Sequence, residues 1–354
     1  MFNYRIFPPL AVLLTLVLGA GAGLVASGPA VADEPVTKAV VIMYHRFGET
    51  DYPSTNVTME QFRAHIEELR TGGYNVASLS TIVAALRNGE ALPPKTVGLS
   101  VDDAYESVYT RAWPILREAG YPLTVFVATD PVDRGLSRYM SWAQIREIAD
   151  QGVTIGSQTK SHPHMADLSA DAVKAELRKS NALFEEKLGN TPDLFAYPYG
   201  ETNNEVMALV KSEGFVAAFG QHSGAIGSGS EMYYLPRFAM NEAFGSVDRF
   251  KLGANALPIR VAEMTPDDPT ITTPNPPLIG FTLTWPVKGL DRLNCYASHV
   301  DKLDLQRLGK RIEVRMDTAM PPGRTRLNCT MPAGNGRWYW FGRQFYVPKK
   351  PQTD

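Results

Sequence analysis

Two adjacent carboxylates, Asp102 and Asp103, directly follow a short apolar run over residues 97–101. Side chains alternate along an extended strand, so neighbouring carboxylates at a strand end can face different ways and take different roles. One can bind a metal ion while the other acts as a general base. A solvated Asp-Asp turn would give the same two residues, but the apolar strand before them favours a functional pair.

Most other side chains suited to chemistry also follow apolar runs or lie at their ends. Four of the six histidines lie at such positions, and so do an amide, a tyrosine, a glycine and an arginine: His45, His162, His164, His222, Gln158, Tyr199, Gly200 and Arg237. Random placement would scatter them. Their positions therefore predict one site, provided that the runs before them are strands of the same sheet.

The elements that would position these residues alternate in type. Short apolar runs predict strands over residues 39–44, 75–79, 96–101, 123–128, 153–156, 194–197, 215–219 and 234–238. Helical patterns lie between most of them, and the first begins with a capping box at Thr58 and Gln61. Alternating β and α elements imply a parallel sheet, and this number of strands indicates a distorted (β/α) barrel of seven to eight strands. Active sites of such barrels lie at the carboxyl ends of the strands.

The C-terminal part has a different pattern. A Pro-rich linker over residues 271–277 precedes strand patterns at 279–285, 311–316 and 337–346. We expect a small β-sandwich over residues 278–354, after a barrel over residues 33–270. Cys295 and Cys329 are the only cysteines, and we expect a disulfide between them in an oxidising compartment.

The N-terminus predicts export. An apolar run over residues 10–24 ends at the A-V-A sequence of residues 30–32, which is typical of a signal peptide over residues 1–32. A permanent membrane anchor is the alternative; after cleavage the mature chain would have no transmembrane anchor and would be periplasmic or extracellular. The formal net charge of −2 gives no reason to expect nucleic acid as a partner. The sequence leaves the oligomeric state open.

Four motifs resemble those of one enzyme family. Residues 100–104 (S-V-D-D-A) resemble the T-F-D-D-G motif of polysaccharide deacetylases, and residues 158–163 (Q-T-K-S-H-P) are similar to their H-[ST]-x-x-H-P metal motif. Residues 195–200 (F-A-Y-P-Y-G) look like their R-x-P-Y-G motif. This family shares the NodB homology domain. Residues 44–45 and 235–238 resemble the branch of the family that deacetylates poly-N-acetylglucosamine. The resemblance covers about residues 39–250.

The resemblance implies a role for each matching residue. Asp102 would be the general base for a metal-bound water, and Arg237 would orient it. Asp103 and His162 would bind one divalent ion, zinc most readily, with cobalt and nickel as alternatives. Tyr199 and Gly200 of the third motif would bind substrate, and Tyr199 would offer its backbone amide to the oxyanion. His45 would protonate the leaving amine, with His222 as a second candidate acid.

Gln158 departs from the family pattern, which has histidine at the first metal-ligand position. An amide oxygen is a weaker zinc ligand than imidazole. Three interpretations stay open: weak ligation by Gln158, substitution by His164, or loss of the metal and of activity.

Two further side chains have competing roles. His222 could contact sugar or be an ordinary surface-loop residue, and Trp142 could stack on a sugar ring or simply pack. The leading function is hydrolysis of N-acetyl groups from an N-acetylated glycan. The alternatives are a carbohydrate-binding or scaffolding protein with a degraded site, and an amide hydrolase for a non-sugar substrate.

Overall fold

A curled parallel sheet forms the centre of the N-terminal part in the computed structural model, which describes residues 1, 37–285 and 289–349. Apart from Met1, the predicted signal peptide lies outside the described residues and stays a prediction. Along the sheet the order is β1, β5, β6, β7, β8, β9, with β4 and β11 pairing β5 and β1. The parallel strands are β1 (Lys38–Tyr44), β4 (Asn75–Val76), β5 (Thr96–Asp102), β6 (Thr124–Val127), β7 (Thr154–Ser157), β8 (Leu194–Ala196), β9 (Ala217–Phe219) and β11 (Phe238–Ala239). This confirms the predicted barrel-like α/β fold.

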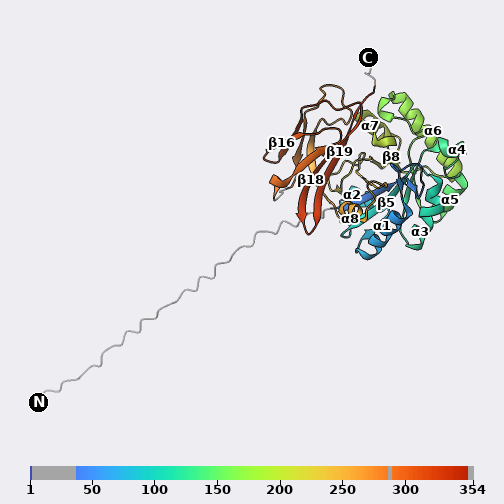
Figure 1. Cartoon of the computed structure of the whole chain (residues 1–354), viewed down its shortest axis with the longest axis horizontal. Helices are drawn as coiled ribbons and strands as arrows, with labels where there is room; N and C mark the ends of the chain where they lie inside the picture. The colour runs from blue at the N-terminus through green and yellow to red at the C-terminus, as the bar shows by residue number, and fades with distance from the viewer. Residues whose placement is uncertain (2–36, 286–288, 350–354) are drawn as a thin grey trace. The chain divides into compact units, whose positions relative to one another are not determined.

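Helices surround this sheet (Figure 1). They are α1 (Met59–Thr71), α2 (Leu79–Asn88), α3 (Trp113–Glu118), α4 (Thr129–Asp133), α5 (Trp142–Asp150), α6 (Ala170–Leu188), α7 (Asn204–Ser212) and α8 (Val247–Ala254), with short turns η1 (Val108–Ala112), η2 (Met165–Asp167) and η3 (Pro198–Gly200). The predicted capping box is present at α1, where Thr58 and Gln61 satisfy each other's backbone amides. Because helices cover the sheet, every residue of β5 is buried, as expected for a central parallel strand.

Two of the predicted strands are wrong in extent. The run 75–79 pairs only over Asn75–Val76, because the Ser78 side chain caps the amide of Thr81 and helix α2 begins at Leu79. The run 234–238 joins two strands: Leu235 pairs in parallel with Phe219 of β9, and Phe238 pairs with β1. This segment therefore closes the sheet between β9 and β1. Three short strands lie outside the parallel set: β10 (Ile226–Gly227), which runs antiparallel to β1, and the pair β2 (Arg46–Phe47) and β3 (Asn56–Val57).

Two four-stranded sheets share one apolar core at the C-terminus. One has the order β12, β19, β18, β15 and the other β13, β14, β17, β16. Their bounds are β12 (Leu257–Pro258), β13 (Val261–Thr265), β14 (Ile279–Leu283), β15 (Asn294–Ala297), β16 (Leu303–Leu308), β17 (Arg311–Met316), β18 (Gly323–Gly334) and β19 (Arg337–Val347), with the turn η4 (Leu290–Arg292) before β15. Since β12 and β13 precede residue 271, the predicted boundary at 278 falls inside these sheets.

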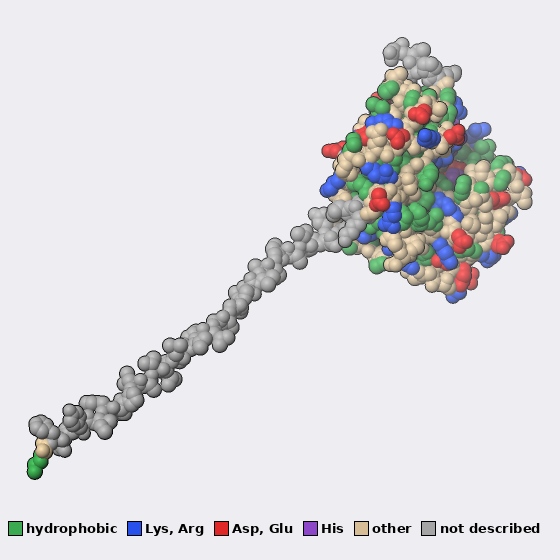
Figure 2. Space-filling view, turned by 60° about the vertical axis from the view of Figure 1, so that its left-hand side comes forward, with side chains coloured by type: hydrophobic (Ala, Val, Ile, Leu, Met, Phe, Trp, Pro, Cys, Tyr) green, Lys and Arg blue, Asp and Glu red, His purple; other side chains and the backbone are tan. Residues whose placement is uncertain are grey.

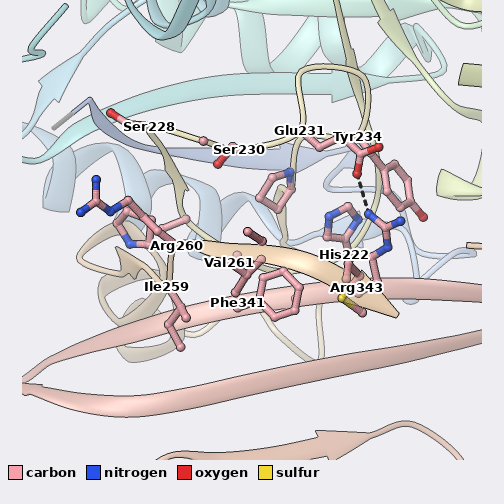
Figure 3. A pocket seen from close by; sticks show the side chains of 18 of the residues that line it. His222, Ser228, Ser230, Glu231, Tyr234, Ile259, Arg260, Val261, Phe341 and Arg343 are labelled. Carbon is pink, nitrogen blue, oxygen red and sulfur yellow. Dashed lines mark hydrogen bonds and ion pairs between the residues drawn. The ribbon is translucent and has the colours of Figure 1, made fainter. Parts of the chain in front are cut away.

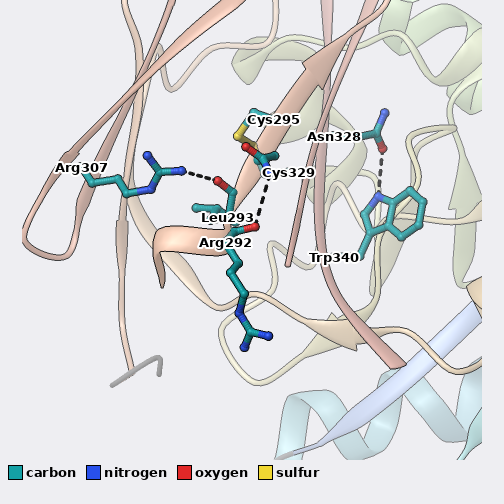
Figure 4. Close-up of a disulfide and its surroundings, with 8 residues drawn as sticks. Arg292, Leu293, Cys295, Arg307, Asn328, Cys329 and Trp340 are labelled. Atoms are coloured by element: carbon teal, nitrogen blue, oxygen red, sulfur yellow. Dashed lines mark hydrogen bonds between the residues drawn. A yellow bond between two sulfur atoms is a disulfide. The ribbon is translucent and has the colours of Figure 1, made fainter. Parts of the chain in front are cut away.

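The expected disulfide is present. Cys295 of β15 and Cys329 of β18 occupy directly paired positions and are bonded to each other (Figure 4). It therefore links two strands of one sheet and confirms the prediction.

The described part of the chain has two further features that bear on function. None of its helices combines the length and apolar character needed to cross a bilayer. On the face shown in Figure 2, acidic and basic side chains are interspersed, in keeping with the small net charge.

Candidate active site

A cleft of about 470 Å³ lies at the carboxyl ends of the parallel strands. Residues that follow different strands meet in it: His45 after β1, Asp103 after β5, His162 after β7 and Tyr199 after β8. The sheet thus brings together four of the predicted site residues, as the strand-end argument requires.

Asp103 and His162 form the polar centre of this cleft. Nε2 of His162 lies 3.3 Å from Oδ1 of Asp103, and this buried oxygen has no hydrogen-bond partner. Two ligands of one tetrahedral zinc ion, each about 2.0 Å from the metal, would be about 3.3 Å apart. Burial raises the pKa of Asp103, but the neighbouring His162 and His45 outweigh burial and lower this pKa to about 2. The pair therefore fits two ligands of a divalent ion.

Gln158 occupies the first position of the metal motif, but its side chain is engaged elsewhere. Its side chain is fully buried, and its Oε1 accepts a hydrogen bond from the backbone amide of Asp103 at 3.1 Å. Its Nε2 has no partner among the described residues. Those residues include no cluster of three His, Cys, Asp or Glu suited to a metal. The described residues thus offer two candidate ligands, Asp103 and His162, with the Gln158 amide beside them.

Asp102 lies beside this centre and is bound by an arginine. Nη1 and Nη2 of Arg237 donate to its two carboxylate oxygens at 2.6 and 2.9 Å, and both side chains are fully buried. Arg237 is itself fixed, because its Nε donates to the Gly220 carbonyl and its backbone amide to the His222 carbonyl. Nε2 of His45 lies 3.9 Å from Oδ2 of Asp102. The expected contact of Arg237 with Asp102 is therefore present, and their catalytic roles stay predictions.

The backbone around the cleft is strained. Five of the ten described non-glycine residues with positive φ lie here: Asp103, Ala104, Thr159, His162 and Tyr199. Such conformations cost about 1–3 kcal/mol each and persist where surrounding structure holds them, often at functional sites. At Tyr199, φ is 60° within the Pro198–Gly200 turn, where the Gly200 amide donates to the Tyr197 carbonyl.

Three predicted side chains lie away from the cleft centre. His222 is buried rather than in a surface loop: it lines a separate cavity of about 210 Å³ with Glu231 and Arg343 (Figure 3), and burial followed by nearby arginine charges lowers its pKa to about 3. Trp142 packs edge-on against Phe184 at 5.8 Å.

His164 is the third. Its ring stacks on Tyr199 at 4.2 Å, and its Nδ1 lies 2.5 Å from Oε2 of Glu201. His164 is therefore engaged with Glu201, and the described residues contain no cluster in which it would be a third ligand beside Asp103 and His162.

The cleft also has lining residues that the sequence analysis did not single out. Tyr105 and Tyr139 form part of one wall, with ring centroids 4.9 Å apart. Gln221 donates to Oδ2 of Asp102 at 3.3 Å, and Arg324 reaches the cleft from the C-terminal sheets. Tyr105 follows the S-V-D-D-A motif directly, which is a signal in the sequence; Arg324 is brought there only by tertiary structure.

Comparisons with known proteins agree with this geometry. Residues 89–218 match the family model described as polysaccharide deacetylase. The chain is 24% identical over 199 residues to a poly-beta-1,6-N-acetyl-D-glucosamine N-deacetylase of Staphylococcus aureus, covering 53% of this chain and 68% of that one. Among solved structures, it is similar to the deacetylase PplD of Streptococcus pyogenes (TM-score 0.57, 22% identity, 62% of this chain and 98% of that one). It is also similar to IcaB from Ammonifex degensii (TM-score 0.53, 24% identity, 59% and 94%).

Proposed function

We propose that this chain, whose residues 89–218 match the polysaccharide deacetylase family model, hydrolyses N-acetyl groups of an amino-sugar glycan, releasing acetate and leaving a free amine. One observation carries the proposal. Asp102, fully buried and bound through both oxygens by Arg237, directly precedes Asp103, which lines the cleft together with His162. A general base beside two metal-binding side chains is what amide hydrolysis by water requires.

Asp103 and His162 would hold one divalent ion, zinc by preference and cobalt or nickel as alternatives. When bound, it would polarise the amide carbonyl and make water acidic enough to ionise near neutral pH.

The protein's own groups divide the remaining work. Asp102 takes the proton from the attacking water through Oδ2, the oxygen that faces His45. Arg237 keeps the carboxylate in one orientation through its two hydrogen bonds. His45 lines the cleft and supplies the proton to the leaving nitrogen. The backbone amide of Tyr199 donates to the developing oxyanion.

The walls of the cleft suit a sugar. Tyr105, Tyr139 and Tyr199 all line it, and tyrosine combines an apolar ring face with a polar hydroxyl. The likeness to a poly-beta-1,6-N-acetyl-D-glucosamine deacetylase favours a neutral N-acetylglucosamine polymer as substrate. The disulfide and the predicted signal peptide favour an exported enzyme.

Acetate release from an N-acetylglucosamine oligomer tests this function. The protein is stripped of metal, reloaded with zinc, cobalt or nickel, and assayed. We expect turnover with at least one ion and none after chelation. If no ion supports acetate release, the deacetylase proposal is wrong.

One observation favours the alternative of a glycan-binding protein with a degraded site. The Gln158 amide oxygen is bonded to the Asp103 amide, so it is not free to act as a third ligand in this arrangement. A chain that binds the oligomer tightly but never releases acetate would support this alternative.

A further inference from the structure

The C-terminal sheets contact the candidate active site directly. Two strands of one sheet supply these contacts, β18 through Arg324 and β19 through Gln344. Arg324 lines the same cleft as Asp103 and His162. This sheet is therefore part of the wall of the cleft.

Gln344 fixes the turn that carries Tyr199. Its Nε2 donates to the carbonyls of Tyr199 at 3.1 Å and Gly200 at 2.7 Å, and the residue is almost fully buried. The Tyr234 hydroxyl joins the same group by donating to the carbonyl of Gly200 or of Gln344, at 2.9 and 3.2 Å. Buried hydrogen bonds thus fix the position of the Tyr199 turn relative to the C-terminal sheet.

Arg324 itself is only weakly held. Its Nε lies 3.5 Å from Oε1 of Glu201, and its Nη1 lies 3.4 Å from the Tyr199 carbonyl oxygen. Charge-assisted hydrogen bonds are usually about 2.7–2.9 Å long. The hydrogen bonds from Arg237 to Asp102, at 2.6 and 2.9 Å, are shorter than either contact of Arg324. The Arg324 side chain is also 37% exposed, whereas that of Arg237 is 0% exposed.

The partner of Arg324 is already shared. Glu201 is 2% exposed and lies 2.5 Å from Nδ1 of His164 through its other oxygen, Oε2. This shorter contact makes His164 the main partner of the carboxylate. The Arg324 guanidinium therefore keeps donor capacity that faces the cleft.

We propose that Arg324 is a substrate-binding residue that the C-terminal sheet contributes to the deacetylase cleft; the inference rests on the proposed function. The Tyr199 ring lies 4.6 Å from the His162 ring and 5.7 Å from the Arg324 guanidinium carbon. The Tyr199 ring therefore lies close to both His162 and Arg324. Arg324 donates hydrogen bonds to hydroxyl and amide oxygens of the sugar unit next to the one that loses its acetyl group.

The test compares binding and turnover of a pentamer and a monomer of N-acetylglucosamine. Arg324→Gln should weaken pentamer binding, measured by calorimetry, by about tenfold or more, as for loss of a hydrogen bond to a charged group. The pentamer KM should rise by a similar factor with little change in kcat, and monomer binding should not change. Arg324→Lys should recover part of the affinity. Arg178→Gln is the matched control and should behave as wild type, because it removes an exposed arginine of helix α6 that pairs only with Glu213 among the described residues.

Three results would overturn the inference: unchanged pentamer affinity in Arg324→Gln, an equal loss for the monomer, or no pentamer binding by the wild type. If the wild type binds the pentamer but releases no acetate with any metal, the proposed deacetylase function fails. The comparison of pentamer affinities still decides the role of Arg324 in that case.

Discussion

Arg237 binds Asp102 through two hydrogen bonds across 135 positions of sequence, and neither side chain is exposed. Arg237 lies on the segment that closes the sheet between β9 and β1. The proposed catalytic base is therefore oriented by the segment that closes the parallel sheet.

We expect Asp102→Asn to lower kcat on an N-acetylglucosamine oligomer by at least ~10², because an amide cannot accept the proton that a general base must take. Asp171→Asn, an almost fully exposed aspartate on α6, is the control and should keep full activity. Near-normal turnover by Asp102→Asn would refute its role as base. Circular dichroism should confirm that the variant is folded under the assay conditions.

Arg237→Met should lower the free energy of unfolding by about 3–5 kcal/mol, because it leaves the buried Asp102 carboxylate without its partner. Urea denaturation measures the loss. Adding Asp102→Asn to Arg237→Met should cost much less than the sum of the two single changes, since the residues are in direct contact. Strictly additive losses would contradict a coupled pair.

The metal prediction concerns affinity. The wild type should bind one zinc ion, His162→Ala should abolish binding, and Gln158→His should tighten it by about tenfold or more, equivalent to ~1.4 kcal/mol. The reason is that imidazole is a better zinc ligand than an amide oxygen that already accepts a hydrogen bond from Asp103. Calorimetry on metal-stripped protein measures all three. A wild type that binds no divalent ion at micromolar concentrations would remove the basis for the mechanism.

Acid should destabilise the fold through His65. This side chain is fully buried, with its Nε2 at 2.8 Å from the Gly245 carbonyl and its Nδ1 at 3.0 Å from the Tyr44 hydroxyl. The carbonyl can only accept, so Nε2 carries the proton and Nδ1 accepts from Tyr44 in the neutral ring. Burial lowers the pKa of His65 from 6.5 to about 4.

Because the folded pKa lies below the unfolded one, the unfolded state binds the proton first as the pH falls. Stability contributed by neutral His65 is complete above pH 6.5, falls between pH 6.5 and 4, and amounts to about 3 kcal/mol. Urea denaturation at several pH values should show that the free energy of unfolding falls less with decreasing pH in His65→Gln than in the wild type. His299→Gln, at an exposed histidine, is the control and should behave as wild type. The same pH slope in His65→Gln and wild type would show that His65 does not contribute.

Removing the disulfide should destabilise the C-terminal sheets. Cys295 and Cys329 are separated by 34 positions, and a loop of this length corresponds to about 3–4 kcal/mol in the chain-entropy model. We expect the double variant Cys295→Ser and Cys329→Ser to lower the free energy of unfolding by about 3–4 kcal/mol. Alkylation and mass spectrometry of the exported protein should find no free thiol, and free thiols at both positions would contradict the bond.

The sequence predicted the centre of the candidate site because its residues follow strands. Asp103, His162 and Tyr199 meet in one cleft for a simple reason: carboxyl ends of parallel strands share one edge. The contact of Arg237 with Asp102 was expected from the family motif. The closing segment 234–238 was misread as an ordinary strand, because its apolar pattern does not show that it crosses from β9 to β1.

Other features depend on tertiary packing that periodicity does not encode. His222 follows a strand, as predicted, but its ring packs against Tyr234 at 4.5 Å and is buried. Strands β12 and β13 were missed because both are short runs before the Pro-rich segment: β12 pairs with β19, far along the chain, and β13 pairs with β14 across that segment. Nothing in the sequence pointed to Gln344, since the hydrogen bonds of a strand amide to a distant turn are visible only in the folded structure.

The contacts between the barrel and the C-terminal sheet limit how the protein can be divided. Trp340 packs edge-on against Phe238 of β11 at 5.1 Å, and Gln344 satisfies the carbonyls of Tyr199 and Gly200. A chain cut after the barrel would expose Phe238 and leave polar groups of the turn without these partners. The barrel is therefore not a portable module, and transplanting it into a fusion protein or shortening it to a minimal enzyme would require a substitute for strand β19.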